Sequence, residues 1–528
     1  MKIEQLHETV RPVTAIVVGL TLAVICGSLV GKGEPKLVFV LFAGIAALIA
    51  LLIARERIWM VIPATWMLGG KVLILPLPFT VTQLGVFVAV GMYLVFKALK
   101  LVRFKPKVGT VEIWMMIMIV YMVTVFVRNP AGMEALGSDR VGGRPYFDIV
   151  VAFGAFWVLA RSVTTARGAF IIPLLGLAGY GLNALVNAVA DRFPSTIGPL
   201  SQLYSGIAAA ENPDLVSGMV DASSRLSYLQ GFGSSLITVA CALWRPFTII
   251  NPVYFWRFLV FFIAAWAILL SGFRSNLFGM IEVVLLSSYL RRGWPEVLRI
   301  GIVAVCVVCP LLLVQGTLIE LPLPAQRALS FLPGKWDYAS KAEAEGSTEW
   351  RVTMWKAMLI EDKYIQNKWL GDGFGYTHHQ LEIMEANALT GSNADQQENL
   401  MISGGVHSGP ISTIRYAGYV GLTIFMILLV LLAIRGARLI RRAEGTPFYF
   451  LAMSIGMPCV LLPFNFVAVF GSFDNDLPNT IFAIGLQRML ENSLDAYENT
   501  QKKKSSPEIV QPPKPRRSLQ FAPLGRTN

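Results

Sequence analysis

The chain has 528 residues, of which 55% are hydrophobic and 15% are charged, with a formal net charge of +12 and a mean hydropathy of +0.58. One water-soluble core cannot bury that much apolar surface, so the composition excludes an ordinary soluble protein and indicates that a membrane is the solvent. The Lys and Arg residues lie mostly between apolar runs and near the C-terminus, which is typical of topology signals rather than of nucleic-acid binding.

Apolar runs of about the length that crosses a bilayer recur along almost the whole chain. Each run must be helical, because backbone N–H and C=O groups find no partner in lipid. The sequence therefore predicts an all-α polytopic membrane protein with about fourteen transmembrane helices. In chain order they are expected near residues 12–30, 37–53, 58–69, 80–97, 110–128, 146–160, 168–190, 231–244, 254–270, 273–290, 297–317, 417–434, 449–470 and 478–490. The first of them is interpreted as an uncleaved signal anchor.

The basic residues between these helices predict which loops face the cytoplasm. Basic clusters such as those in 97–107 and 435–442 alternate correctly with the helix order. The same alternation places both termini in the cytoplasm and leaves three longer polar stretches on the opposite face: 129–144, 191–230 and 319–416.

The chain is therefore expected to have four parts. They are eleven transmembrane helices with short loops (1–317), one large outer loop that is partly helical (318–416), the last three transmembrane helices (417–490), and a disordered basic cytoplasmic tail (491–528). The large loop is the only segment long enough for a small extramembrane domain, so the chemistry is expected there.

One amphipathic helix is predicted inside the large loop. Ser and Thr in 346–349 suit a helix start, and the pattern continues to about Ile365. Arg351 and Trp355 are one turn apart on one face of this helix. The glycines in 372–375 then end it.

Three of the four histidines, His378, His379 and His407, lie in the same loop. His407 precedes a helix whose first turn suits Pro410. The positive end of a helix dipole disfavours an imidazolium, so a neutral ring that can accept a proton is expected there. His407 is therefore the candidate catalytic histidine. The alternative is a loop histidine that only packs or caps.

Arg274 lies between two apolar runs that are joined by almost no loop. A guanidinium is costly at the bilayer centre, so Arg274 is expected at the outer membrane boundary beside an anionic partner. Its planar donors suit phosphate oxygens. A structural arginine paired with a carboxylate such as Glu282 is the alternative.

Further arginines are predicted on the same outer face. Arg351, Arg225 and Arg415 add cations, and together with Arg274 and a histidine they make a plausible cradle for a diphosphate. Trp355 is a candidate for stacking on a sugar ring, although aromatic residues also anchor loops in the membrane interface.

The sequence has no phosphate-binding glycine loop, no serine-hydrolase elbow, no zinc-protease motif and no pair of aspartates in the outer loops that suits a metal. All five cysteines lie in apolar runs, which argues against disulfides and zinc sites. A reaction without metal or cofactor is expected.

Several segments together carry a family resemblance. They are 270–276 (LSGFRSN), 349–357 (EWRVTMWKA), 370–375 (LGDGFG), and His407 followed by 415–422 (RYAGYVGL). They resemble the O-antigen ligase and O-antigen polymerase superfamily of bacterial membrane glycosyltransferases. Members are inner-membrane proteins with many helices and one large periplasmic loop late in the chain, as expected here.

The resemblance implies a metal-independent glycosyltransferase on the periplasmic face. Its donor would be a glycan on undecaprenyl diphosphate, and its acceptor a hydroxyl of a glycan or lipid in O-antigen or exopolysaccharide biosynthesis. Arg274 and Arg351 match the arginines that grip the diphosphate, and His407 matches the histidine that orients or deprotonates the acceptor. The expected partners are these substrates, membrane lipids and other polysaccharide assembly proteins, with no nucleic acid.

Two other functions stay open. One is a transporter or flippase of lipid-linked sugar, because many helices and basic residues also suit a path for an anionic headgroup. The other is a noncatalytic component of a polysaccharide export complex. The sequence does not separate a ligase from a polymerase.

Overall fold

The computed structural model describes residues 55–71, 73, 79–100, 108–132, 141–207, 225–390 and 393–505. The helices predicted near 12–30 and 37–53 lie outside these residues. Within the described ranges the chain is helical and forms no β-strand. The prediction of an all-α protein is confirmed.

Six described helices are long and apolar enough to cross a membrane. They are α4 (Val81–Ala98), α5 (Thr110–Arg128), α7 (Ala166–Arg192), α15 (Trp294–Val314), α20 (Gly409–Ala443), and α21 (Tyr449–Phe464) with the π-helix η4 (Asn465–Val469). Two shorter apolar helices are α11 (Leu229–Leu243) and α13 (Phe255–Leu270). The protein is therefore a helical membrane protein.

The remaining helices complete the bundle and cover one of its ends. In the bundle they are η1 (Arg55–Met60), α3 (Val61–Trp66), α6 (Arg144–Leu159), α12 (Pro246–Ile249), α14 (Arg274–Arg292) and α22 (Phe473–Ser505). The short η3 (Pro194–Thr196) and α8 (Ile197–Leu203) follow α7. The cap layer consists of α16 (Leu323–Leu329), α17 (Tyr338–Ile360), α18 (His378–Thr390) and α19 (Asn393–Ser403), with the loops that join them.

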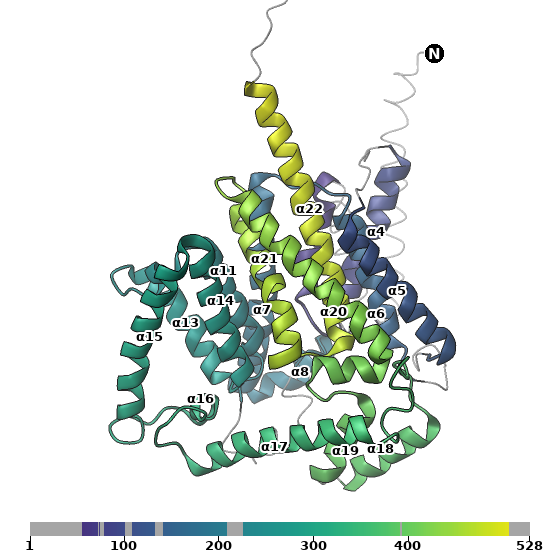
Figure 1. Cartoon of the computed structure of the whole chain (residues 1–528), viewed down its shortest axis with the longest axis vertical. Coiled ribbons are helices and arrows are strands. Elements are labelled where there is room, and N and C mark those ends of the chain that lie inside the picture. Colours follow the sequence, from purple (N-terminus) through teal and green to yellow (C-terminus); the bar gives the residue numbers. More distant parts are fainter. Residues whose placement is uncertain are drawn as a thin grey trace, which may run out of the picture.

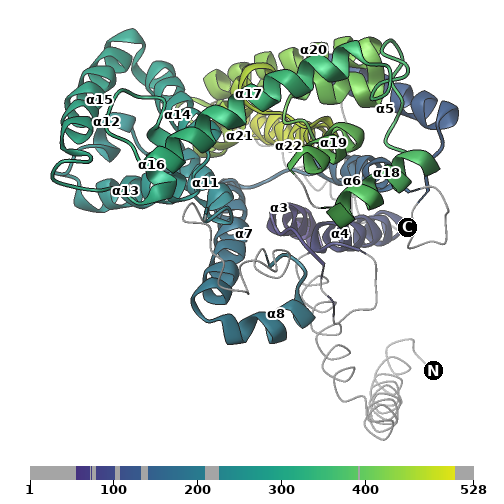
Figure 2. The same ribbon diagram turned by 90° about the horizontal axis from the view of Figure 1, so that it is seen from below.

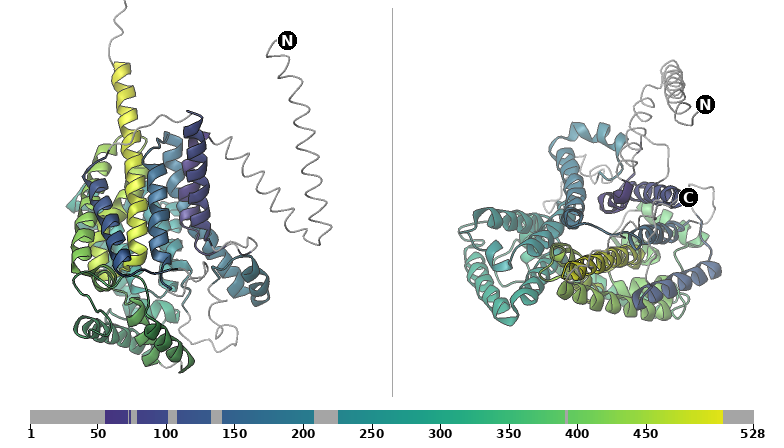
Figure 3. Two further views of the ribbon diagram at one scale, coloured as in Figure 1. Left: turned by 90° about the vertical axis from the view of Figure 1, so that its right-hand side faces the viewer. Right: turned by 90° about the horizontal axis from the view of Figure 1, so that it is seen from above.

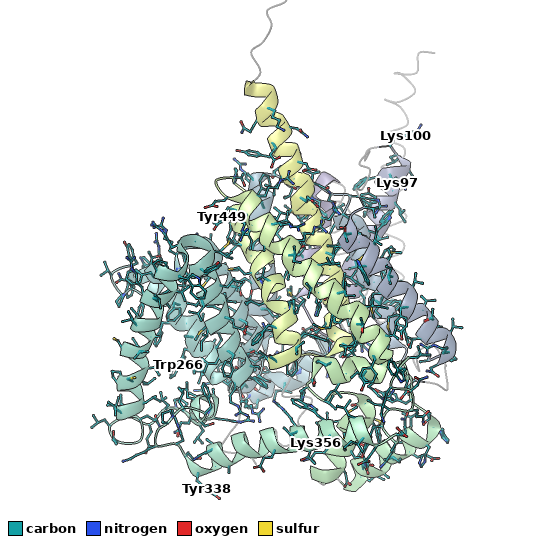
Figure 4. All side chains as sticks on the ribbon, in the orientation of Figure 1. Lys97, Lys100, Trp266, Tyr338, Lys356 and Tyr449 are labelled. Atoms are coloured by element: carbon teal, nitrogen blue, oxygen red, sulfur yellow. The ribbon has the colours of Figure 1, made fainter. Side chains whose placement is uncertain are left out.

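The cap layer lies across one end of the upright bundle, and α22 projects from the other end (Figure 1). Seen from below, α17 runs across the bundle end from the α13–α15 side toward α20 (Figure 2). Figure 3 shows the same separation from the side. In Figure 4, Tyr338 and Lys356 of α17 lie at the end opposite to Lys97, Lys100 and Tyr449. Lys97 and Lys100 belong to a basic segment that is expected in the cytoplasm. This segment and the cap layer thus lie at opposite ends of the bundle.

Two expected boundaries are wrong. Helix α17 begins at Tyr338 rather than near Gly346, because the Asp337 side chain accepts a hydrogen bond from Ser340 N at 3.0 Å and caps the helix earlier. It ends at Ile360. Helix α22 continues to Ser505, although a disordered tail is expected from Glu491.

The extension of α22 is held by ion pairs with α20. Arg442 donates to Asp495 at 2.6 Å and to Glu498 at 2.9 Å. Closer to the bundle, Arg435 and Arg488 both donate to Glu112 of α5 and to Glu491 of α22. These charges neutralise one another where three helices meet, and so they keep α22 helical beyond the apolar segment.

Helix α20 is interrupted at Gly418, which has a φ of 69°. The interruption frees backbone groups, and the loop after α17 satisfies them. Tyr419 N donates to Lys368 O at 2.9 Å and Val420 N to Trp369 O at 3.2 Å. In the other direction, the N–H groups of residues 372 and 373 donate to the carbonyls of residues 415 and 416. These four bonds attach the cap layer to the bundle.

Gly418→Ala tests this attachment. An added Cβ would meet Trp369 O at 2.2 Å, in a backbone conformation that favours glycine. We expect a loss of about 2 kcal/mol or more in the free energy of unfolding, seen as a lower thermal midpoint of the detergent-solubilised protein. The matched control is Gly301→Ala in α15, where an added Cβ meets nothing within 4 Å. Equal midpoints for the two variants would contradict the account.

Candidate functional site

The turn between α13 and α14 places two arginines at the cap-layer end of the bundle. Gly272 adopts a φ of 70°, and a Cβ there would meet Arg225 Cγ at 3.1 Å, so glycine permits the close approach of Arg225. The Arg225 guanidinium lies over the Phe273 ring at 5.5 Å. Arg274 is the first residue of α14. Arg225 thereby packs against the turn from which Arg274 begins α14.

Helix α17 brings a third arginine to this turn. Arg351 is half-buried on α17, and its Nε is buried without a hydrogen-bond partner among the described residues. The positive charges of Arg274 and Arg225 lie close enough to lower the pKa of Arg351, after the larger effect of its burial. Three guanidiniums therefore face one region and repel one another, which is the electrostatic setting that an anion relieves.

His407 lies in the loop between α19 and α20, beside the arginine side chains. It is half-buried, and its ring packs against Phe470 with centroids 5.1 Å apart. Its backbone φ is 53°, an uncommon conformation for a residue other than glycine. Burial lowers the pKa of His407, and the charge of Arg351 lowers it further. The imidazole is therefore neutral at neutral pH and can accept a proton, as predicted from its position before a helix.

Trp355 fixes the position of α17 relative to the His407 loop. Its Nε1 donates to Val406 O at 2.9 Å, one residue before His407. Val406 is fully buried in a small apolar cluster that joins α17, α19 and the start of α20. This cluster consists of Met354, Met358, Tyr364, Ile365, Ile402, Val406, Ile411 and Ile414. Because Arg351 is one turn before Trp355, the same contact sets the approach of Arg351 to His407. We name Arg225, Arg274, Arg351 and His407 the cation–histidine cluster.

Arg415 is not part of this cluster. Its side chain is 2% exposed, and its Nη1 lies 3.5 Å from Asp372 Oδ2 and 3.4 Å from Gly373 O. Asp372 also accepts from Gln366 N and Asn367 N, each at 2.8 Å. Arg415 therefore joins α20 to the loop of the cap layer, beside the interruption at Gly418.

The other two histidines of the large loop belong to α18 rather than to the loop that carries His407. His378 and His379 are exposed at the start of α18, 3.3 Å and 3.8 Å from Glu382. Tyr416 is buried, and its hydroxyl donates to Ser403 O. Two positions that sequence reasoning missed are Gly371 and Gly418, whose left-handed backbones allow the cap-layer loop to contact α20. In the sequence, the only indication of these two positions is that 370–375 and 415–422 are rich in glycine.

The arrangement can hold a doubly charged group and accept a proton beside it. Arginine side chains from α14, α17 and the segment before α11 converge on one region, and a neutral histidine lies next to Arg351. Planar guanidiniums bind phosphate oxygens in pairs of hydrogen bonds. Such a site suits a reaction in which a phosphate leaves and a hydroxyl loses its proton.

No model of a known protein family matches the chain, and no curated protein matches it.

Proposed function

We propose that the protein is a glycosyltransferase of the O-antigen ligase and polymerase type, acting on the periplasmic face of the bacterial inner membrane. Its donor is a glycan on undecaprenyl diphosphate, and its acceptor is a hydroxyl of a growing surface polysaccharide or of a lipid. The observation that carries the proposal is the convergence of Arg351, Arg274 and Arg225 beside a half-buried His407. The sequence resemblance supports it at three of these positions, Arg274, Arg351 and His407.

In this proposal each group has a defined task. The three guanidiniums bind the diphosphate and stabilise the charge that develops on it as it leaves. The acceptor oxygen attacks the anomeric carbon, the bond from that carbon to the diphosphate oxygen breaks, and the diphosphate keeps the electron pair. His407, neutral because of burial and Arg351, takes the proton of the acceptor hydroxyl. The account needs no metal.

The proposed topology has fourteen transmembrane helices, cytoplasmic termini and a periplasmic cap layer. Its support is that Lys97 and Lys100 lie at the bundle end opposite to α17 (Figure 4), together with the positive-inside rule. Helices α6, α14 and α22 complete the count beside the six long apolar helices, the two shorter ones and the segments before residue 70. Charges on α14 and α22 explain why hydropathy alone does not select these helices.

The first test is transfer by the purified protein from a lipid-diphosphate-linked glycan. His407→Ala is expected to lower the rate by a factor on the order of 10²–10⁴, because a positioned base is lost. The matched control is His379→Ala, which removes an exposed histidine of the same loop and should leave the rate unchanged. Full activity of His407→Ala at an unchanged thermal midpoint would exclude the role assigned to His407, and no transfer by wild type would favour a transporter or a noncatalytic component.

The pH profile of the same reaction separates a base from a packing residue. Since the pKa of His407 is lowered, the rate should stay constant through neutral pH and fall only below the usual histidine range, near about 6.5. Arg351→Gln removes a positive charge beside the ring and thus raises the pKa of His407. The residual activity of that variant should therefore begin to fall at a higher pH. If the activity of Arg351→Gln begins to fall at the same pH as that of wild type, or at a lower pH, the coupling between Arg351 and His407 is contradicted.

The topology is tested with single cysteines in a chain whose own five cysteines are replaced. Lys356 and Lys97 are both exposed, at opposite ends of the bundle (Figure 4). A membrane-impermeant maleimide added to cells with a permeabilised outer membrane should label Lys356→Cys and should label Lys97→Cys only after lysis. The reverse pattern would overturn the orientation.

A further inference from the structure

A polar cavity opens in the cap layer, apart from the cation–histidine cluster. Its volume is about 530 Å³, within the range of small-molecule sites. It lies between the end of α5, the loop after α17, the start of α18 and α20. Its charged and hydrogen-bonding lining includes Arg128, Gln366, Asp372, Tyr376, His378 and Arg415. None of Arg225, Arg274, Arg351 and His407 lines it.

Arg415 and Asp372, which both line this cavity, form an ion pair. Arg415, which is 1% exposed, pairs with Asp372, and two backbone N–H groups also donate to the Asp372 carboxylate. The four backbone bonds between the loop and α20 hold both residues in place. The pair therefore shapes the cavity and contributes no net charge to it.

The wall carries one uncompensated positive charge, Arg128. Its Nε donates to Thr124 O at 3.2 Å and its Nη2 to Leu370 O at 3.0 Å. Among the described residues it pairs with no carboxylate, and its side chain is exposed at the rim. These two carbonyl contacts orient the guanidinium and leave its charge available to a ligand.

The rest of the wall offers neutral hydrogen-bonding groups. Burial raises the pKa of the Tyr376 hydroxyl, so it stays protonated and can donate. The amides of Gln366 and Asn129 add donors and acceptors on other sides of the cavity. Several neutral groups around one guanidinium fit a ligand with many hydroxyls and one carboxylate.

We propose that this cavity binds a carboxylate-bearing sugar unit of the glycan, with Arg128 taking the carboxylate and Tyr376, Gln366 and Asn129 taking hydroxyls. The assignment of the sugar to the transferred or extended glycan rests on the proposed function. The binding itself does not, because it is measured without transfer.

The experiment measures binding to the full-length detergent-purified protein by calorimetry. The probes are a glucuronic-acid-containing tetrasaccharide and the same tetrasaccharide with its carboxyl groups reduced to alcohols. Wild type should bind the acidic probe about tenfold more tightly, since a hydrogen-bonded ion pair is lost with the reduced one. Equal affinities, or competition by inorganic phosphate as strong as by the acidic probe, would overturn the proposal.

Variants locate the binding in this cavity. Arg128→Gln should remove the preference for the acidic probe, whereas Arg128→Lys should keep part of it. Tyr376→Phe should lower the affinity for both probes. The matched control is Arg192→Gln, an exposed arginine at the end of α7, which should change neither affinity. A preference that survives in Arg128→Gln at an unchanged thermal midpoint would overturn the assignment.

The same material separates this proposal from the proposed function. His407→Ala should bind both probes as wild type does and yet fail in transfer. If wild type binds the acidic probe selectively but transfers no glycan, the proposed glycosyltransferase function is wrong and the proposed saccharide site stands. If wild type transfers glycan but shows no preference for the acidic probe, the proposed saccharide site is wrong and the proposed glycosyltransferase function stands.

Discussion

The interruption of α20 at Gly418 is the constraint on which the rest of the structure depends. A helix in a membrane cannot leave backbone groups unpaired, so a break near the bilayer needs partners from elsewhere in the chain. The loop after α17 supplies them through four backbone hydrogen bonds, and Tyr121 of α5 donates to Ala417 O at 2.7 Å. Gly371 permits the approach, since a Cβ there would meet Ala417 at 2.5 Å. The cap layer is thus attached to the bundle by its own main chain.

The candidate site follows from that attachment. Arg274 comes from the bundle, Arg351 from the cap layer and His407 from the loop that enters α20, so no single element contains the site. The attachment at Gly418 holds the start of α20, and the Trp355 contact with Val406 holds α17 against the His407 loop. Like charges are thereby kept together at a cost that a bound anion would offset. The pairing of Arg415 with Asp372 belongs to the attachment rather than to the cluster.

Sequence reasoning predicted the parts of this architecture that hydropathy and local spacing determine. The helices α4, α5 and α7 begin and end within a few residues of their expected bounds, because lipid forces an apolar run into a helix. Helix α17 begins earlier than expected because Asp337 caps it. The separation of Arg415 from the cluster was not predictable, since it depends on Asp372, which is distant in sequence. The long α22 depends in the same way on Arg442 of α20.

The most direct test of the central claim is the profile of lipid-linked and mature glycans in cells that lack the protein. The account predicts that glycan accumulates on its lipid diphosphate, as single repeat units for a polymerase or as long chains for a ligase. Wild type should restore the normal profile, whereas His407→Ala, produced at the same level, should not. An unchanged profile in the deletion strain, or full restoration by His407→Ala, would contradict the account.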